Sequence, residues 1–253
     1  KKIRKWKPDV LIMRYWMSYF APSLGSVSRK MPKGCVRIGI LDNVVPHEPH
    51  FFDAPLTRWY LKSLDGAVTL CDEVAQDLMA LRKDIPHTTI PHPTYTHFGE
   101  AISKSEAEDL LGIPHVEGSR TLLFFGLIRE YKGLDVLIRA MRLLDPRYRL
   151  IIAGEPYGSF EKYDELISES GESSRFFIYP QYIRDSEVKK YFCAADLTVL
   201  PYKSATQSGI SAVSNHFEKP MVVTDVGGLK ETIGDRGTGM VCKKCTPECV
   251  AEA

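Results

Sequence analysis

Arg129 and Lys132 are two cations in a short loop whose residue types could bind phosphate. Residues 121–125 before them are apolar or β-branched, as in a strand covered on both faces, and Gly126 ends the run. After Gly133, apolar residues recur at helical spacing. A helix N-terminus attracts anions, so two cations beside it form a site for a phosphate or diphosphate. The alternative is an ordinary solvated loop in which Arg129 forms a surface ion pair.

The elements that must hold this loop alternate between strand and helix along most of the chain. Apolar patterns predict strands at residues 10–16, 37–41, 66–70, 121–125, 149–153, 175–179, 196–201 and 221–224. They predict helices at residues 54–63, 72–82, 105–111, 134–144, 160–168, 186–194, 210–217 and 229–233, with Asp72 and Ser186 as N-caps. This alternation predicts an α/β fold with parallel, doubly wound sheets.

A proline-rich stretch at residues 90–93 predicts a linker, because each proline keeps the residue before it out of a helix. We therefore expect an N-terminal domain at residues 1–95 and a C-terminal domain at residues 96–253. The chain has no initiator methionine, and few residues follow a strand that would start at Val241. Both Rossmann-like domains are therefore expected to be incomplete.

The composition excludes several classes of protein. Hydrophobic residues at 44% and charged residues at 26% are typical of a globular chain. The formal net charge of +1 argues against a nucleic-acid-binding surface spread over the whole molecule. No apolar run reaches the ~18–20 residues of a membrane span, and the basic residues 1–7 precede a strand rather than the apolar region of a secretion signal.

Three of the six cysteines, Cys242, Cys245 and Cys249, form a C-x-x-C-x-x-x-C pattern. A tetrahedral zinc site needs four ligands, and no second Cys or His pair stands at partner spacing. We expect no metal here, and metal binding is the less favoured alternative. The other cysteines lie in apolar segments and are expected to be core residues in a reducing compartment.

Ligands of doubly wound sheets bind at the carboxyl ends of the strands. Four predicted loops lie at such ends, at residues 126–132, 154–158, 180–183 and 202–209. They supply two cations, several hydroxyls and a glycine at a helix start, but no Cys or Ser nucleophile with an evident base and no P-loop pattern. This set predicts binding of a phosphorylated, hydroxyl-rich ligand rather than covalent catalysis.

Several motifs follow one another in a fixed order: FFGLIREYKGLDVLIRAM, RLIIAGE, VLPY, SATQSGIS and KPMVVTDVGGLKETI. Over residues 121–241 this order resembles the nucleotide-binding half of retaining GT-B glycosyltransferases of the group 1 or family 4 type. The earlier segments DNVVPHE and VTLCDEVAQDL are similar to parts of that family's acceptor domain. The resemblance implies two Rossmann-like domains.

The resemblance implies that Arg129 and Lys132 are the catalytic residues. They would hold the donor diphosphate and stabilise its growing negative charge without a metal ion. Many members of the family place the arginine directly after the glycine. Here Leu127 stands at that position, so Arg129 must reach the diphosphate from two residues further on.

The resemblance assigns nine residues to donor binding: Gly126, Tyr182, Ile183, Thr206, Gln207, Ser208, Gly209, Ile210 and Glu231. Gly209 and Ile210 match the opening of the helix in the family's E-x7-E motif, whose backbone amides meet the phosphate. Both glutamates are missing, because Thr206 stands at the first position and Ser214 or Val213 at the second. Hydroxyl and amide groups of residues 206–208 could bind the sugar instead.

The remaining assignments concern the base and the acceptor. Tyr182 and Ile183 would hold the base, and Glu231 would either contact the donor or pack the turn before it. On the acceptor side the resemblance points to Asp42, which replaces a histidine common in the family, and to Asn43, His47 and Glu48. The last two residues would line the acceptor cleft or cap their loop.

The implied function is transfer of a hexose or related sugar from a nucleotide diphosphate sugar to an acceptor hydroxyl with retention of configuration. The donor would be a UDP- or GDP-sugar, and the acceptor would be a glycan or a lipid-linked molecule. No cofactor is expected. The relatives imply bacterial polysaccharide biosynthesis in the cytoplasm, with peripheral contact to the inner membrane surface as an option. Two alternatives stay open: a nucleotide-sugar epimerase on the same fold, and a catalytically degenerate nucleotide-sugar-binding protein.

Overall fold

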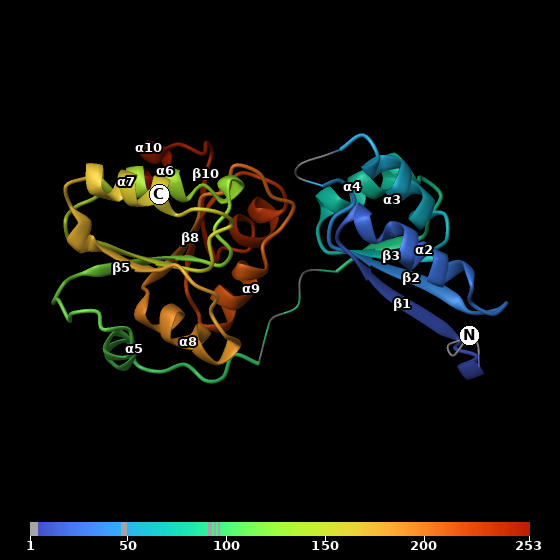
Figure 1. Ribbon diagram of the computed structural model, residues 1–253, viewed down its shortest axis with the longest axis horizontal. Coiled ribbons are helices and arrows are strands. Elements are labelled where there is room, and N and C mark those ends of the chain that lie inside the picture. The colour runs from blue at the N-terminus through green and yellow to red at the C-terminus, as the bar shows by residue number, and fades with distance from the viewer. Residues whose placement is uncertain (1–4, 47–49, 91–92, 94, 96) are drawn as a thin grey trace. The chain divides into compact units, whose positions relative to one another are not determined.

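The computed structural model describes residues 5–46, 50–90, 93, 95 and 97–253. The chain divides into two compact units, residues 1–92 and residues 93–253 (Figure 1). This division falls within the proline-rich stretch and three residues before the predicted boundary at residue 95.

Unit 1 is a parallel four-stranded sheet with helices packed against it. The strands are β1 (Val10–Tyr15), β2 (Val36–Leu41), β3 (Gly66–Thr69) and β4 (His87–Thr89), in the spatial order β1-β2-β3-β4. The helices are the 3-10 turn η1 (Ser18–Phe20), α2 (Ala21–Arg29), α3 (Asp53–Leu61) and α4 (Asp72–Leu81). Consecutive strands pair in parallel, and at least one helix connects the members of each pair.

The core of unit 1 lies on one face of its sheet. Side chains of α2, α3 and α4 join Met13 and Tyr15 of β1 in a single cluster, where the rings of Tyr15 and Tyr60 stack at 4.6 Å. The alternate residues Val10 and Ile12 of β1 are exposed, because successive side chains of a strand point to opposite faces. Among the described residues, this second face of β1 carries no helix of unit 1.

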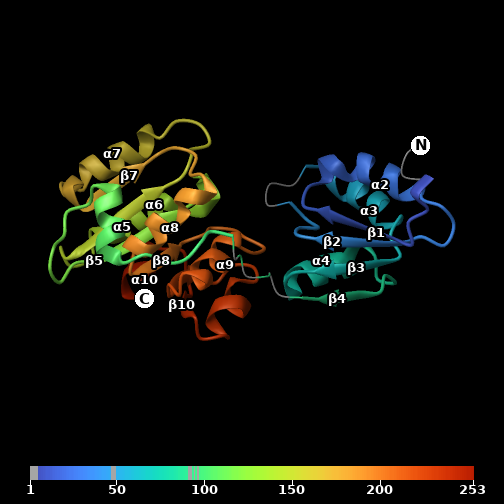
Figure 2. The same cartoon turned by 90° about the horizontal axis from the view of Figure 1, so that it is seen from below.

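Unit 2 contains a parallel six-stranded sheet (Figure 2), and the order of its strands reverses at the centre. Its strands are β5 (Arg120–Phe125), β6 (Tyr148–Ala153), β7 (Phe176–Tyr179), β8 (Leu197–Leu200), β9 (Met221–Thr224) and β10 (Gly239–Cys242). Their spatial order is β10-β9-β8-β5-β6-β7, so the chain moves to one side from β5 to β7 and to the other side from β8 to β10. The carboxyl ends of β5 and β8 therefore flank the switch point at which doubly wound sheets bind ligands.

Helices cover both faces of this sheet (Figure 1). One face carries α6 (Leu134–Met141), α7 (Glu161–Glu169) and α10 (Pro247–Glu252), and the other carries α5 (Lys104–Leu111), α8 (Asp185–Ala194) and α9 (Gly209–His216). The remaining turns are η2 (Glu130–Lys132), η3 (Ser173–Arg175) and the π-helical η4 (Lys230–Gly234). Burial on both sides explains why β5 is an unbroken apolar run: Phe124 faces one helical layer and Phe125 the other.

The α/β class and the parallel sheets of both units are confirmed, and the errors lie at short or polar elements. The predicted N-caps are wrong: Cys71 and Arg184 occupy the cap positions of α4 and α8. Three elements were not predicted, namely α2, β4 and α10. Helix α2 contains Pro22, Gly25 and three serines, and β4 reads HTT, so neither shows a regular apolar period.

Candidate functional site

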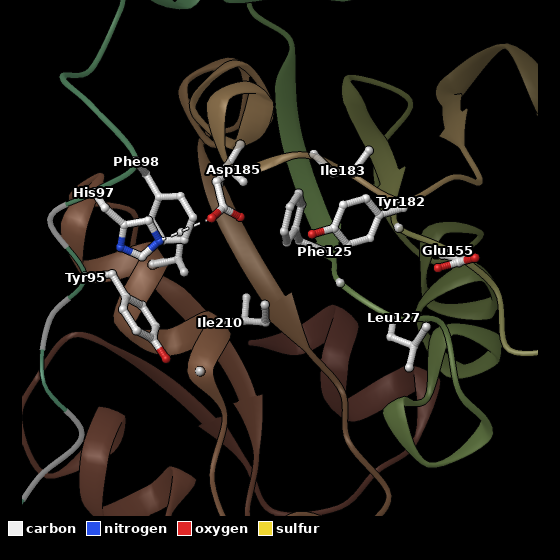
Figure 3. Close-up of a pocket in the computed structure, with 15 residues that line it drawn as sticks. Tyr95, His97, Phe98, Phe125, Leu127, Glu155, Tyr182, Ile183, Asp185 and Ile210 are labelled. Atoms are coloured by element: carbon white, nitrogen blue, oxygen red, sulfur yellow. Dashed lines mark ion pairs between the residues drawn. The ribbon is translucent and has the colours of Figure 1, made fainter.

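A pocket of about 620 Å³ opens at the carboxyl ends of β5 and β6 and at the first turn of α9 (Figure 3). All of its walls belong to unit 2, and they are Tyr95, His97, Phe98, Phe125, Gly126, Leu127, Gly154, Glu155, Tyr182, Ile183, Asp185, Val188, Gly209, Ile210 and Val213. The position is the switch point of the sheet. The lining is largely aromatic and aliphatic with a few polar groups, which is the usual composition of a small-molecule site.

Gly126 joins this pocket to the ammonium group of Lys132. A Cβ atom at Gly126 would lie 3.2 Å from Lys132 Nζ and 3.3 Å from Ile210 Cδ1. The ammonium and the first turn of α9 therefore flank the same glycine. Gly126 also has φ of +100°, a conformation that disfavours any other residue.

Lys132 carries a buried charge with no counterion among the described residues. Its side chain is only 9% exposed, and no described carboxylate forms an ion pair with it. Burial, and to a smaller extent the nearby charge of Arg129, lower the pKa of Lys132 to about 8. A buried cation without a counterion is costly, and an anion bound beside it would offset that cost.

Arg129 lies beside Lys132 and also lacks a carboxylate partner among the described residues. Its guanidinium stands 4.3 Å from the ring centre of Tyr157, and its Nε atom is buried without a hydrogen-bond partner there. Other lysines of the region are neutralised, since Glu130 accepts hydrogen bonds from Lys162 and Lys203 and its pKa falls to about 2 as a result. The surface ion pair considered for Arg129 is therefore not found in the described structure.

The start of α9 completes the polar side of the site. Ser208 is the N-cap, and its Oγ accepts a hydrogen bond of 3.2 Å from the Ile210 N–H. The same Oγ lies 3.1 Å from the hydroxyl of Tyr202, so the hydroxyl of Ser208 is occupied in holding the helix start. The first turn of α9 lies at the pocket, where Gly209 and Ile210 are wall residues. A helix start placed in this way adds partial positive charge to that of the two cations.

Thr206 and Ser214 stand where the E-x7-E motif would have its glutamates, and their surroundings differ. Ser214 is fully buried and donates a hydrogen bond of 3.0 Å to Thr198 of β8, so it faces the sheet rather than the pocket. The carbonyl of Thr206 accepts a 2.7 Å hydrogen bond from the Gly228 N–H and thus holds the glycine turn before η4. Glu231 on η4 and Gln207 are half-buried, and neither is among the residues that line the pocket.

The aromatic side of the pocket contains both predicted and unpredicted residues. Tyr182 is 69% exposed and lies with the buried Ile183 on the wall that follows β7. Tyr95, His97 and Phe98 complete the opposite wall, and His97 Nε2 lies 3.7 Å from a carboxylate oxygen of Asp185 (Figure 3). Sequence reasoning missed these three residues because they follow the proline-rich stretch and belong to no periodic element. The only signal was the dense run of aromatic and histidine residues there.

The profile of the glycosyl transferases group 1 family matches residues 108–253, which is most of unit 2. The chain belongs to this family. A D-inositol 3-phosphate glycosyltransferase of Mycolicibacterium gilvum is 28% identical over 197 residues, which cover 74% of this chain and 43% of the relative. The chain spans about half the length of the curated relatives it matches.

Solved glycosyltransferases share the fold of this group 1 member. The sucrose-phosphate synthase of Thermosynechococcus elongatus superposes with a TM-score of 0.81 at 17% identity, over 96% of this chain and 63% of the other. HepE of Anabaena, solved in complex with UDP-glucose, has a TM-score of 0.79 at 14% identity over 96% and 67% of the two chains. At these identities the likeness shows the GT-B fold.

In unit 1, the predicted acceptor residues follow β2. Asp42 accepts a 2.7 Å hydrogen bond from Arg14 Nε and forms an ion pair with it, so part of its carboxylate has a structural role. Asn43 follows Asp42 and is half-buried. His47 and Glu48 lie outside the described residues.

Two further expectations concern metal and membrane. Cys242, Cys245 and Cys249 are free thiols that pack with the core between the sheet and α6. Within the described ranges, no group of three or more His, Cys, Asp or Glu residues is arranged to hold a metal ion. Over the same ranges, no helix has both the length and the apolar character needed to cross a membrane.

Proposed function

We propose that this chain carries the donor site of a retaining glycosyltransferase that uses a nucleotide diphosphate sugar. The observation that carries the proposal is that Lys132 Nζ and the first turn of α9 flank Gly126 in a pocket at the switch point of the sheet, with Arg129 close enough to affect the charge of Lys132. Two cations without described counterions suit two linked phosphates. The aromatic wall of the pocket suits a nucleoside base.

The proposed chemistry is stabilisation of a departing diphosphate. Cleavage of the sugar–oxygen bond leaves a nucleoside diphosphate whose negative charge increases in the transition state. Cations that are already fixed in place stabilise that charge without having to reorganise. Lys132 is supported by its burial and Arg129 by its contact with Tyr157, so both are held before the substrate arrives. This arrangement would act without a metal ion.

The donor and acceptor are finer parts of the proposal. A UDP-sugar is the first candidate donor, because HepE was solved with UDP-glucose, and a GDP-sugar is the second. The acceptor would present a hydroxyl on a glycan or a lipid-linked sugar, and a lipid-linked acceptor would bring the enzyme to the inner membrane surface. The sugar transferred would be a hexose.

Calorimetric titration with UDP, GDP and the two monophosphates tests the site. We expect a diphosphate to bind more tightly than its monophosphate, and Lys132→Ala to weaken diphosphate binding and lower turnover by about 10²-fold, the scale of losing one contact to a developing oxyanion. Lys244→Ala is the matched control, because it removes one lysine charge from an exposed position of the same unit. Equal affinities of the Lys132→Ala variant and the wild type would exclude the proposed role of Lys132.

Product analysis in the full-length protein distinguishes the proposed transferase from its two rivals. Transfer with an unchanged anomeric configuration, read by NMR of the product, supports the proposal. Epimerisation of the donor sugar would instead indicate an epimerase, for which Glu155 and Asp185 are the carboxylates on the pocket wall. Donor binding without transfer or hydrolysis would indicate a degenerate binding protein.

A further inference from the structure

The position of Arg129 needs a structural explanation. Arg129 is a half-buried residue of the loop that follows β5, three residues after Gly126. A guanidinium carried by an unsupported loop would sample many rotamers, and ordering it would weaken any contact with a ligand. Some other part of the molecule must therefore hold Arg129.

The loop after β6 supports the loop after β5 along its backbone. The Ile128 N–H donates to the Glu155 carbonyl at 2.8 Å, and the Tyr157 N–H donates to the Ile128 carbonyl at 2.9 Å. Ile128 and Pro156 form an isolated parallel bridge, so the two loops extend the pairing of β5 and β6 beyond the sheet. Ile128 is 2% exposed and anchors this extension in the core.

This pairing brings Tyr157 next to Arg129. The ring centre of Tyr157 lies 4.3 Å from the guanidinium carbon, which is within the range of a cation–π contact. Tyr157 is 73% exposed, so the ring contributes little to the core. The exposed ring and the half-buried cation therefore form a local pair, and Tyr157 follows the pocket residue Glu155 by two positions.

An aromatic face supports a cation without cancelling its charge. A carboxylate partner would also hold Arg129, but it would occupy the N–H donors and repel an incoming phosphate. A ring contacts the flat face of the guanidinium and leaves the N–H groups in its plane available. The next residue in the loop, Glu130, differs from Arg129 in this respect. Its carboxylate forms ion pairs with Lys162 and Lys203.

We propose that Tyr157 is a positioning residue, which holds the guanidinium of Arg129 toward the diphosphate. This inference rests on the proposed function, because it assigns Arg129 a diphosphate ligand. It adds a residue that lies outside the family's motif and on a different loop.

The test compares Tyr157→Leu with Tyr157→Phe. Leucine keeps apolar bulk but lacks the ring, whereas phenylalanine keeps the ring and lacks only the hydroxyl. We expect Tyr157→Leu to weaken UDP or GDP binding about 2–5-fold, the range of an exposed cation–π contact, and Tyr157→Phe to bind as the wild type does. Because the ring is exposed, both variants should melt at the wild-type temperature.

A double-mutant cycle separates positioning from a general effect on the fold. In an Arg129→Met background, Tyr157→Leu should change the affinity no further, because the group that the ring holds is absent. NMR of the Arg129 Nε–H group in the nucleotide-free protein gives a second readout, with an ordered signal in the wild type and loss of that order in Tyr157→Leu.

The outcomes distinguish this inference from the proposed function. Nucleotide binding that depends on Lys132 but is unaffected by Tyr157→Leu would overturn the role of Tyr157 and leave the donor site intact. An equal loss from Tyr157→Leu in the wild-type and Arg129→Met backgrounds would also overturn it. Failure of every nucleoside diphosphate to bind the wild-type protein would overturn the proposed function itself.

Discussion

Lys132 carries a charge that the protein buries without a described counterion. Its lowered pKa is the physical signature of that arrangement, and the main cause is loss of hydration rather than the Arg129 charge. Charged groups are stabilised by water, so removal of water favours the neutral amine. The same feature that makes the residue costly in the empty protein makes it an effective partner for an anion.

Diphosphate affinity should therefore decrease as the pH rises through about 8, because the ammonium of the free protein loses its proton there. Calorimetry with UDP or GDP from about pH 7 to about pH 9.5 checks this, a range in which the nucleotide phosphates stay ionised. Lys132→Arg, whose guanidinium keeps its proton, is the control and should give a nearly flat profile. An identical pH dependence in both proteins would assign the effect to another group.

Removal of the charge should stabilise the empty protein. Lys132→Met replaces an uncompensated buried cation by an apolar chain of similar length, and we expect a gain of about 1–3 kcal/mol in the free energy of unfolding near neutral pH. The folded-state pKa lies below that of the unfolded chain, so the penalty is complete below about pH 8 and disappears above the ordinary lysine pKa of 10.5. Urea denaturation at several pH values measures the gain, and Lys244→Met should show none. A loss of stability in Lys132→Met would contradict this account.

At the scale of elements, the site depends on close approaches of backbone segments. Gly133 ends η2 and starts α6 with φ of +69°, and a Cβ atom there would lie 1.9 Å from the Pro201 carbonyl oxygen at the end of β8. A Cβ atom at Gly154 would likewise lie 2.1 Å from the Gly126 carbonyl oxygen. These glycines let the loops after β5, β6 and β8 pack without side chains between them.

Gly133→Ala should destabilise the protein more than backbone strain alone explains. Gly112 is a matched control, because its φ of +67° is nearly equal but a Cβ atom there would meet nothing within 4 Å. We expect Gly112→Ala to cost about 1 kcal/mol from the positive φ, and Gly133→Ala to cost at least about 2 kcal/mol more because α6 must move away from Pro201. Chemical denaturation of both variants measures the difference. Equal losses would mean that the contact with Pro201 relaxes at no cost.

At the scale of the whole molecule, the predicted phosphate, base and helix-start residues all belong to unit 2. Its sheet is covered on both faces, and its two large hydrophobic clusters lie on opposite sides of β5 and β6. The pocket is lined by residues of this unit alone, from Tyr95 to Val213. Unit 1 contributes the acceptor candidates Asp42 and Asn43.

Residues 93–253 expressed alone should therefore fold and bind a nucleoside diphosphate with nearly the affinity of the whole chain. A cooperative thermal transition and calorimetry with UDP or GDP check the two parts of this prediction. We expect the dissociation constant to stay within about 3-fold of that of the whole chain, which corresponds to less than 1 kcal/mol. A folded unit that binds more than tenfold more weakly would show that residues 1–92 contribute to donor binding.

The sequence by itself determined the class of fold, and it singled out the loop with Arg129 and Lys132 as the candidate phosphate site. Period-2 and period-3.6 patterns depend on local backbone geometry, so the long apolar elements were located within a few residues. Arg129 and Lys132 were singled out for the same reason. The strand and the glycine before them and the helix after them are all local features of the chain.

The tertiary structure alone decided which groups share the pocket and what each polar group does. Ser208 and Ser214 have the same side chain, yet the first caps a helix at the pocket and the second is bonded to Thr198 inside the core. Tyr157 and Arg129 meet only because two loops from different strands pair beyond the sheet. Such contacts depend on the packing of segments far apart in the chain, and no pattern along the chain records them.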